Sequence, residues 1–425
     1  MIEPSRLPPL VVETRPIDPV ADPVSYADPL HPLAWLRRDE AIVGVGPAVI
    51  ELSLDAATAA TQWREVVGRS QIDDTVGMPG SGLIAFGILP FDPRSSAGGH
   101  LVIPRTIVGT RQGRSWITRV RRADEPTWVD GAGLPPAIPY GPHWSATVGP
   151  GALDPEGYQH AVRAGVSAIA SGRVQKVVLA RDLVGTVPAA ADLRRLVRAL
   201  ASNYPDTWTF AVDGLIGASP ETLVTVQTGT VTARVLAGTI ARGADAESDA
   251  SASAALAISG KDRDEHRFAV ASVTEALEHF TSDLDAPSAP HLLELPNLWH
   301  LATDVVGHLS NGASSLDLVR ALHPTAAVAG TPTDAAIDLI RELEPFDRGR
   351  YAGPVGWVDA HGDGEWAIAL RCAQLGGTSS GRVPHATGTI PVVAHAGAGI
   401  VAESDPESEL LETRVKFRPI VDALA

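Results

Sequence analysis

The sequence predicts an α+β fold with large antiparallel sheets. Short apolar segments separated by Gly/Pro turns fill the first part of the chain, as in antiparallel sheet proteins. Later strands and helices come in uneven runs, without the regular βαβ alternation of a parallel sheet. With 44% hydrophobic and 20% charged residues over 425 positions, the composition is that of a globular protein with material for a large core.

The first 33 residues form a proline-rich arm. Prolines stand at positions 4, 8, 9, 16, 19, 23, 29 and 32, and proline interrupts both helices and the hydrogen-bonded ladder of an inner strand. We therefore expect residues 1–33 to be an extended arm on the surface. From residue 35 to about 150, apolar segments such as 41–50 and 83–89 are expected to be antiparallel strands.

The later part of the chain has clear start and stop signals. Asp154 and Pro155 suit the N-cap and first position of a helix that stops near Gly172. Thr331 is expected to cap another helix, with Pro332 at its first position. Apolar spacing predicts strands at 174–183, 207–215, 221–226, 230–236, 355–359, 365–374 and 390–395, and helices at 262–280, 333–343 and 406–417.

Composition and missing motifs exclude several functional classes. A formal charge of −16 without a basic stripe argues against nucleic-acid binding. No run of 18 apolar residues and no signal-peptide pattern occurs, so no membrane partner is expected. The single cysteine, Cys372, excludes an internal disulfide and favours a cytoplasmic location. Motifs of P-loop, dinucleotide-binding, serine-hydrolase and zincin sites are also missing.

Lysine is rare, since Lys176, Lys261 and Lys416 are the only lysines among 34 Lys and Arg residues. Lysine offers an amine that can lose its proton, which a guanidinium does not. Lys176 lies in a β-branched run and points to the side opposite Val177. It is either an edge-strand charge that blocks aggregation or a functional amine. A general base needs its pKa lowered from ~10.4 toward ~7–8.

Two predicted helices carry acidic side chains on one face. Asp262 and Glu265 are three residues apart, and Glu409, Glu412 and Lys416 follow at i, i+3 and i+7. Such pairs are most often solvated, weakly interacting surface charges. If the two helices face each other, the carboxylates instead offer the all-oxygen ligand set that Mg²⁺ prefers.

Three further segments carry candidate site groups, none of which signals much alone. Glu221 follows a Ser-Pro turn at the head of a predicted strand. Segments 237–239 and 397–399 contain glycines, which let backbone N–H groups approach an anion. Taken singly, each of these segments is more often an ordinary turn.

Together and in this order, the segments resemble the chorismate-utilising enzymes, most closely the isochorismate synthases of the menaquinone-pathway type. The resemblance runs from about Asp154 to the C-terminus. It implies one chorismate-binding domain over residues 34–425, with two large, mostly antiparallel sheets packed together and helices outside; residues 34–150 are its divergent N-terminal half and 151–425 its catalytic half. The matching motifs are KVVLAR, GASPE, LAGT, KDRDEH, LHPTAAVAGTP, EPFDRGRYAGPVGW, EWAIALR and GAGIVAESDPESELLET, followed by Lys416.

The resemblance implies an isomerase that converts chorismate to isochorismate with Mg²⁺. Water adds at ring C2 while the C4 hydroxyl leaves. Lys176 matches the general base that activates water, and Glu221 matches the acid that protonates the leaving hydroxyl. The metal positions are Glu265, Glu412, Asp262 and Glu409. The substrate positions are Gly238, Thr239, His300, Ala327, Tyr351, Arg371, Gly397, Gly399 and Lys416.

Two positions favour the synthase among its relatives. Ala327 stands where amine-installing and salicylate-forming relatives carry threonine, and anthranilate synthases replace Lys176. Val328, where siderophore-pathway synthases tend to carry leucine, suggests the menaquinone type. The alternatives are a salicylate synthase, an ammonia-using anthranilate or aminodeoxychorismate synthase with a glutaminase partner, and a catalytically dead chorismate-binding protein. We expect chorismate as small-molecule partner and a monomer with no obligatory protein partner.

Overall fold

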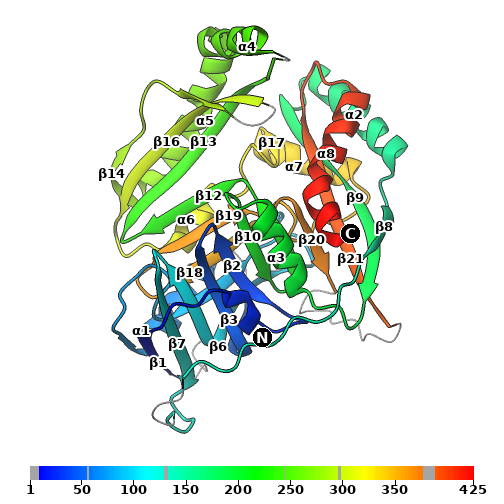
Figure 1. Ribbon diagram of the computed structural model, residues 1–425. Helices are drawn as coiled ribbons and strands as arrows, with labels where there is room; N and C mark the ends of the chain where they lie inside the picture. Colours follow the sequence, from blue (N-terminus) through cyan, green and yellow to red (C-terminus); the bar gives the residue numbers. More distant parts are fainter. Residues whose placement is uncertain (1–8, 55–56, 129–132, 244, 295–297, 377–387) are drawn as a thin grey trace. The chain divides into compact units, whose positions relative to one another are not determined.

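The computed structural model of the protein describes residues 9–54, 57–128, 133–243, 245–294, 298–376 and 388–425 (Figure 1). The fold is α+β with predominantly antiparallel pairing, as the sequence predicts. Contacts divide the chain into two units. Unit 1 comprises Met1–Glu221, His323–Ala360 and Ala367–Ala425, and unit 2 comprises Thr222–Leu322 and His361–Trp366. None of the described helices is both long and apolar enough to cross a membrane.

Unit 1 holds most of the strands. These are β1 (Leu10–Ile17), β2 (Leu33–Arg37), β3 (Glu40–Leu54), β4 (Gln71–Asp74), β5 (Ile84–Ile88), β6 (Gly99–Arg111), β7 (Arg114–Arg122), β8 (Thr147–Pro150), β9 (Lys176–Pro188), β10 (Trp208–Val212), β11 (Leu215–Ser219), β17 (Gly330–Thr331), β18 (Pro354–Asp359), β20 (Cys372–Leu375) and β21 (Thr389–Ile400). Its helices are the 3-10 turn η2 (Pro23–Tyr26), α1 (Ala59–Gly68), α2 (Pro155–Ala170), α3 (Arg194–Asn203), α7 (Thr333–Leu343) and α8 (Pro406–Leu424).

The strands of unit 1 pair edge to edge in a long ladder. Its order is β4–β1–β7–β6–β3–β2–β10–β11–β20–β21–β9–β8, and only the β4–β1 pair is parallel. Strand β9 is an inner strand, because β21 lies along one edge and β17 and β8 share the other. Lys176, the first residue of β9, is therefore not the charge of an edge strand.

The expected surface arm is wrong for residues 10–17, which form strand β1. Strand β1 lies between β4 and β7, and the side chains of Leu10, Val12 and Thr14 are at most 1% exposed. The prolines did not prevent an inner strand because Pro8 and Pro9 precede β1 and Pro16 lies near its end. Residues 10–15 therefore keep their backbone donors and alternate between core and surface.

Two predicted strands are split by turns. The 207–215 segment becomes the hairpin of β10 and β11, with Asp213 at φ 47 in the turn. The 365–374 segment becomes β19 and β20, because Arg371 between them has a φ of 50, which an extended strand does not permit. Non-glycine residues adopt this conformation rarely, and its position between two strands sets the direction of the Arg371 side chain.

The predicted helices are present with small shifts at their ends. The Asp154 side chain caps α2 by accepting from the Gly157 N–H at 2.8 Å, as expected. Helix α7 starts at Thr333, so Pro332, not Thr331, is its N-cap residue. Helix α8 continues past residue 417 to Leu424 and contains Pro419.

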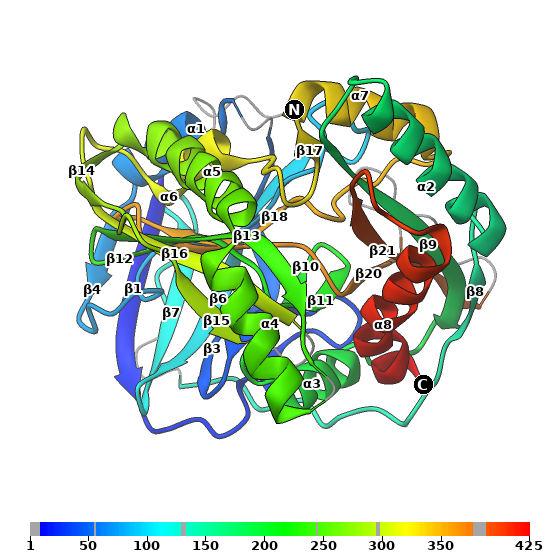
Figure 2. The ribbon, with the colours of Figure 1, turned by 90° about the horizontal axis from the view of Figure 1, so that it is seen from above.

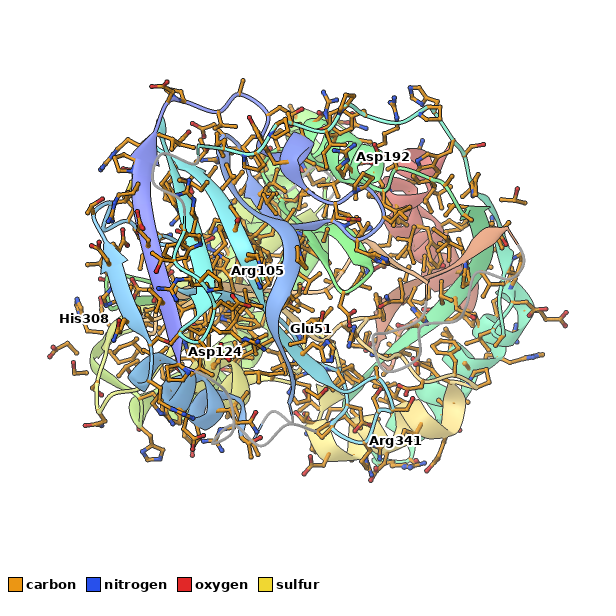
Figure 3. The ribbon with its side chains drawn as sticks, turned by 90° about the horizontal axis from the view of Figure 1, so that it is seen from below. Glu51, Arg105, Asp124, Asp192, His308 and Arg341 are labelled. Carbon is orange, nitrogen blue, oxygen red and sulfur yellow. The ribbon has the colours of Figure 1, made fainter. Side chains whose placement is uncertain are left out.

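Helices α2, α7 and α8 pack around strands β9 and β21 (Figure 2). Helices α3 and α8 share a buried apolar core with β21, in which Leu196, Leu200 and Phe417 are at most 3% exposed. At the start of α3, the Asp192 carboxylate accepts from Arg194 at 2.7 Å and from the Gly141 N–H at 2.8 Å (Figure 3). This core fixes α8, which carries Lys416, against the β9–β21 pair.

A buried ion pair holds the beginning of strand β9 in place. The Arg348 guanidinium donates to both carboxylate oxygens of Glu344, to the Val178 carbonyl at 2.7 Å and to the Val328 carbonyl at 3.1 Å. The Glu344 carboxylate also accepts from the Ala180 N–H at 2.7 Å. Burial alone would lower the pKa of Arg348, but the charge and hydrogen bonds of Glu344 raise it. Three segments distant in sequence are thus joined at one guanidinium.

Unit 2 contains a smaller antiparallel sheet with helices. Its elements are β12 (Thr222–Gln227), β13 (Thr230–Ala241), α4 (Ala246–Ile258), α5 (Gly260–Glu278), β14 (Thr281–Asp285), β15 (His291–Glu294), β16 (Leu298–Leu309), α6 (Ser315–Leu322) and β19 (Gly364–Ile368), whose last two residues belong to unit 1. Strand β13 lies between β12 and β16, with an irregular register between Leu236 and Thr239. Helices α4 and α5 both contact β13 and β16.

We predict that Arg348→Met lowers the free energy of unfolding by about 3–5 kcal/mol, because it leaves the Glu344 carboxylate buried without its cation. The matched control is Arg173→Met, which breaks the exposed Arg173–Glu342 pair and should cost less than about 1 kcal/mol. Urea unfolding followed by circular dichroism measures both values. Equal losses in the two variants would show that burial of the Arg348–Glu344 pair does not matter.

Candidate active site

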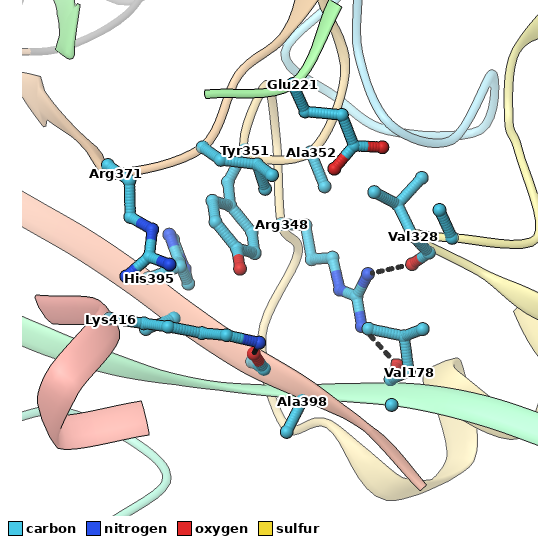
Figure 4. Close-up of a pocket in the computed structure, with 15 residues that line it drawn as sticks. Val178, Glu221, Val328, Arg348, Tyr351, Ala352, Arg371, His395, Ala398 and Lys416 are labelled. Carbon is cyan, nitrogen blue, oxygen red and sulfur yellow. Dashed lines mark hydrogen bonds between the residues drawn. The ribbon is translucent and has the colours of Figure 1, made fainter. Parts of the chain in front are cut away.

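One partly enclosed cavity in unit 1 is lined by seven of the fifteen predicted site residues (Figure 4). Its volume is about 110 Å³, on the order of the ~150 Å³ cavity known to bind one benzene ring, which suits a ligand built on one six-membered ring. The lining residues are Val178, Glu221, Ala327, Val328, Arg348, Tyr351, Ala352, Leu370, Arg371, His395, Ala396, Gly397, Ala398, Gly399 and Lys416.

Glu221 enters the cavity from the turn after β11. The Ser219 hydroxyl accepts from the Glu221 N–H at 3.2 Å and donates to the Ile368 carbonyl at 2.6 Å, while the Glu221 carbonyl accepts from the Ile368 N–H at 3.0 Å. The backbone that carries the Glu221 side chain is therefore fixed. Burial raises the pKa of Glu221, and the positive charges of Lys176 and Lys416 only partly oppose this. The site thus favours a protonated carboxyl that can donate a proton.

Lys176 lies next to the cavity across Gly399. A Cβ placed on Gly399 would lie 3.0 Å from the Lys176 Cε atom and 3.7 Å from its Nζ atom. The lysine side chain therefore extends over the space that a side chain at position 399 would occupy. The positive charge of Lys176 lowers the pKa of Glu221, so the amine acts electrostatically on the carboxyl.

Lys416 projects from α8 to the cavity. Its ammonium donates to the Gly397 carbonyl at 2.8 Å and lies 2.6 Å from the Glu412 carboxylate. The strand register decides which way the backbone of β21 faces here. Gly399 pairs with Val178, and Gly397 pairs with Ala180. The N–H group of Val178 donates to the Ala329 carbonyl and that of Ala180 to the Glu344 carboxylate, so neither donates to β21. By the antiparallel alternation, the N–H groups of Gly397 and Gly399 also face away from β9.

Tyr351, Arg371 and His395 form another wall of the cavity (Figure 4). The Arg371 backbone is held to β11, since its carbonyl accepts from the Ala218 N–H at 3.2 Å. Burial lowers the pKa of Arg371 and raises the pKa of Tyr351. Burial also lowers the pKa of His395 to about 4. At neutral pH this wall therefore presents one cation, Arg371, beside a neutral phenol and a neutral imidazole.

The loop before α7 forms the remaining side. Ala327 and Val328 line the cavity, and the Val328 carbonyl accepts from Arg348 at 3.1 Å. The Val328 side chain is only 3% exposed, whereas Ala327 is exposed. The two positions that the sequence singles out as sensitive to reaction type thus both contact the cavity.

Unit 2 carries the other predicted residues. Gly238 has a φ of 79 at the irregular step of β13, and a Cβ placed there would lie 3.1 Å from the Cβ atom of Asp262. The Ser259 hydroxyl bonds to the Asp262 carboxylate, and the Ser259 side chain caps α5. His300 pairs with Thr239 across β13 and β16. The side chains of Thr239 and Glu265 lie outside the described part of the structure.

The predicted metal positions are divided between the units, with Asp262 and Glu265 on α5 and Glu409 and Glu412 on α8. On α8, the Glu409 carboxylate accepts from the Ser404 hydroxyl at 2.7 Å. Burial raises the pKa of Glu409, whereas the hydrogen bond from Ser404 lowers it. The neighbouring charge of Glu412 raises this pKa further. Two mutually repelling carboxylate groups fit a hard divalent cation, which stabilises both charges.

In unit 1 the structure brings together Glu221, Ala327, Tyr351, Arg371, Gly397, Gly399 and Lys416, with Lys176 adjacent. The sequence did not identify Arg348 and His395 as site residues. His395 could have been found by strand periodicity, because it shares a face with Gly397 and Gly399. Arg348 lies within the EPFDRGRYAG motif, but nothing in that motif tells a scaffolding arginine from a substrate-binding one.

The family described as chorismate binding enzyme matches residues 141–425. A Mycobacterium tuberculosis protein provisionally named isochorismate synthase MenF is 39% identical over 361 residues, 81% of this chain and 87% of that protein. The isochorismate synthase DhbC of Bacillus subtilis is 40% identical over 283 residues, covering 64% of this chain and 68% of the relative.

The solved structure of MenF, the menaquinone-specific isochorismate synthase from Escherichia coli, aligns with a TM-score of 0.74 and 26% identity. The alignment covers 98% of this chain and 95% of that structure. These findings confirm the resemblance to isochorismate synthases that the sequence motifs indicate. By its sequence and its fold, the chain belongs to the chorismate-binding enzyme family.

Proposed function

We propose that the protein is an isomerase, an isochorismate synthase, that converts chorismate to isochorismate with Mg²⁺. One observation carries the proposal: a buried carboxyl with a raised pKa, Glu221, shares a ring-sized cavity with Arg371 and Lys416 and interacts with Lys176. Acid, base and anion-binding groups are the parts that exchange of a ring hydroxyl in a cyclic diacid needs. Relatives with isochorismate synthase names support the same reaction.

Glu221 acts as the general acid. Its carboxyl is kept protonated by burial and gives its proton to the hydroxyl that leaves ring C4. Lys176 acts as the general base, and the deprotonated form of its amine takes a proton from the water that adds at C2. The small residue at position 399 leaves the space through which the lysine reaches this water. Neither side chain forms a covalent bond with the ring.

Arg371, Tyr351 and Lys416 hold the substrate carboxylates, together with the N–H groups of Gly397 and Gly399. The chain has a formal charge of −16, so an anionic substrate needs local cations, and the cavity supplies Arg371 and Lys416. A guanidinium binds a carboxylate in a planar, bidentate manner. These contacts orient the ring between the acid and the base.

Glu265 and Glu412 would hold Mg²⁺, with Asp262 and Glu409 at positions that bind its water molecules. When bound, Mg²⁺ would neutralise a ring carboxylate and polarise the ring toward displacement. Gly238, Thr239 and His300 of unit 2 would complete the substrate site. We propose that both units act as one chorismate-binding domain over residues 34–425, in a monomeric, cytoplasmic enzyme without an obligatory protein partner.

A salicylate synthase is the second candidate, because the same cavity could eliminate pyruvate from isochorismate. Ala327 favours the synthase, since it lines the cavity at the position where salicylate-forming relatives carry threonine. Val328, also at the cavity, favours the menaquinone type. Salicylate and pyruvate as the main products would establish the second candidate.

We predict that the purified protein converts chorismate to isochorismate, and that Lys176→Ala and Glu221→Gln each reduce turnover by roughly 10²–10⁴-fold. Chromatography of the products after incubation with chorismate and Mg²⁺ measures both. Circular dichroism should show unchanged folding of the variants. A folded wild-type protein that yields no isochorismate would contradict the assignment.

Glu412→Ala is predicted to abolish activity at every Mg²⁺ concentration and to weaken metal binding by at least about 10–100-fold, the range seen when supporting groups of a metal site are removed. The control is Glu407→Ala, an exposed carboxylate in the first turn of the same helix. Electron paramagnetic resonance of Mn²⁺ measures binding apart from turnover. Wild-type Mn²⁺ binding in Glu412→Ala would remove Glu412 from the site.

The pH dependence follows from the raised pKa of Glu221. A general acid works below its pKa, so activity is lost as pH rises through that value. Lys416 lowers this pKa by favouring the ionised carboxylate. Lys416→Met should therefore raise the pKa of Glu221 and move the alkaline limb of the kcat/KM profile to higher pH. Carboxyl ¹³C NMR, with Glu221→Gln to identify the signal, measures the pKa. Arg418→Met, an exposed cation of α8, should leave it unchanged.

A further inference from the structure

His395 is an ionisable cavity residue for which the proposed reaction provides no role. It lies in β21 opposite Asp182 of β9, two residues before Gly397. The side chain is partly exposed to the cavity. Within the described part of the chain, neither nitrogen of its ring has a hydrogen-bond partner. The contacts that its ring makes are aromatic, with Tyr351 and Phe346, which suggests a role in packing against them.

The ring of His395 contacts two aromatic side chains of one segment. It stacks on Tyr351 with centroids 5.1 Å apart and an interplanar angle of 25°, and it contacts Phe346 at 5.0 Å and 49°. Stacked aromatic pairs at these distances contribute beyond the area they bury. Arg348, which lies between Phe346 and Tyr351 in the sequence, holds the segment in place. Its guanidinium donates to Glu344 and to the carbonyls of Val178 and Val328.

The hydrogen bonds at Arg348 fix the backbone of Tyr351 but not its ring. The Tyr351 N–H donates to the Arg348 carbonyl at 3.0 Å, which sets the Cα position and leaves the side-chain torsions to the neighbouring groups. The stacking on His395 supplies that constraint. In Figure 4 the Tyr351 hydroxyl points toward the side of the cavity where Lys416 lies.

We propose that His395 is a positioning residue, whose ring holds Tyr351 so that the phenol hydroxyl meets the substrate. The inference rests on the proposed function, because it takes chorismate as the ligand. It distinguishes two roles that the same position could have. A stacking platform acts through Tyr351 and needs no charge, whereas a direct anchor for a carboxylate must be an imidazolium.

The charges around His395 agree with the platform. From β9 the Asp182 carboxylate and from the 344–352 segment the Asp347 carboxylate favour the imidazolium, while Arg348 opposes it. Burial outweighs these charges and lowers the pKa of His395 to about 4. Tyr351, uncharged, and Arg371 are the other groups of this wall. Over pH 6–8 the ring is therefore neutral, and chorismate affinity should not follow its titration.

The test is a double-mutant cycle on chorismate binding. In a Glu221→Gln background chorismate stays largely unconverted, so calorimetry with Mg²⁺ reports binding. His395→Ala should weaken binding about tenfold, as expected for loss of one well-placed hydrogen bond. His395→Phe, which keeps a ring for stacking, should bind within about threefold of the reference. Tyr351→Phe should weaken binding about as much as His395→Ala, and the double variant should bind no worse than Tyr351→Phe alone.

Three results would overturn the inference. These are unchanged binding in His395→Ala, losses that add in the double variant, and an affinity that falls steeply from pH 6 to pH 8 in the reference but not in His395→Phe. The product assay on the wild-type protein separates this inference from the proposed function. Chorismate binding with a product other than isochorismate would reject the function and leave the cycle valid, whereas absence of chorismate binding would reject both.

Discussion

The buried Arg348–Glu344 pair is the interaction on which the site depends. Strand β9 brings Lys176, the loop before α7 brings Ala327 and Val328, and the segment after α7 brings Tyr351. These segments meet where the Arg348 guanidinium bonds the Val178 and Val328 carbonyls and where Glu344 accepts from Ala180. An ion pair with both charges buried stabilises a fold only when its remaining hydrogen bonds are satisfied. Here backbone groups of the cavity wall satisfy them, so the pair also fixes the shape of the wall.

Burial and charge act in opposite directions on the groups of the cavity. Burial raises the pKa of Glu221 and lowers the pKa of His395, so both side chains favour their neutral forms. Arg371 stays charged because guanidinium does not lose its proton in proteins. The same low-polarity surroundings thus favour a protonated carboxyl and a neutral ring beside a permanent cation. A cyclic diacid bound there would meet a cation and a protonated carboxyl at the same time.

Helix α8 combines two predicted tasks on one stripe. Glu409, Glu412 and Lys416 follow helical spacing, and in the structure Lys416 bonds both the Glu412 carboxylate and the Gly397 carbonyl. The apolar side of the helix, including Phe417 and Ile420, packs in the core with α3 and β21. The packed side fixes the rotation of the helix, and Lys416 on the other side lines the cavity.

The sequence by itself determined the features that depend on neighbouring residues. The Asp154 cap, the extent of α7, the α8 stripe and the strand alternation at Lys176 follow from local hydrogen bonding and from the periods of helix and strand. The ordered motifs also indicated the family, although the roles of Lys176, Glu221 and the four metal positions remain predictions. Tertiary structure alone decided that β1 is an inner strand, that Arg348 joins three segments and that His395 stacks on Tyr351. These features depend on contacts with residues far along the chain, which the spacing of neighbouring residues does not reveal.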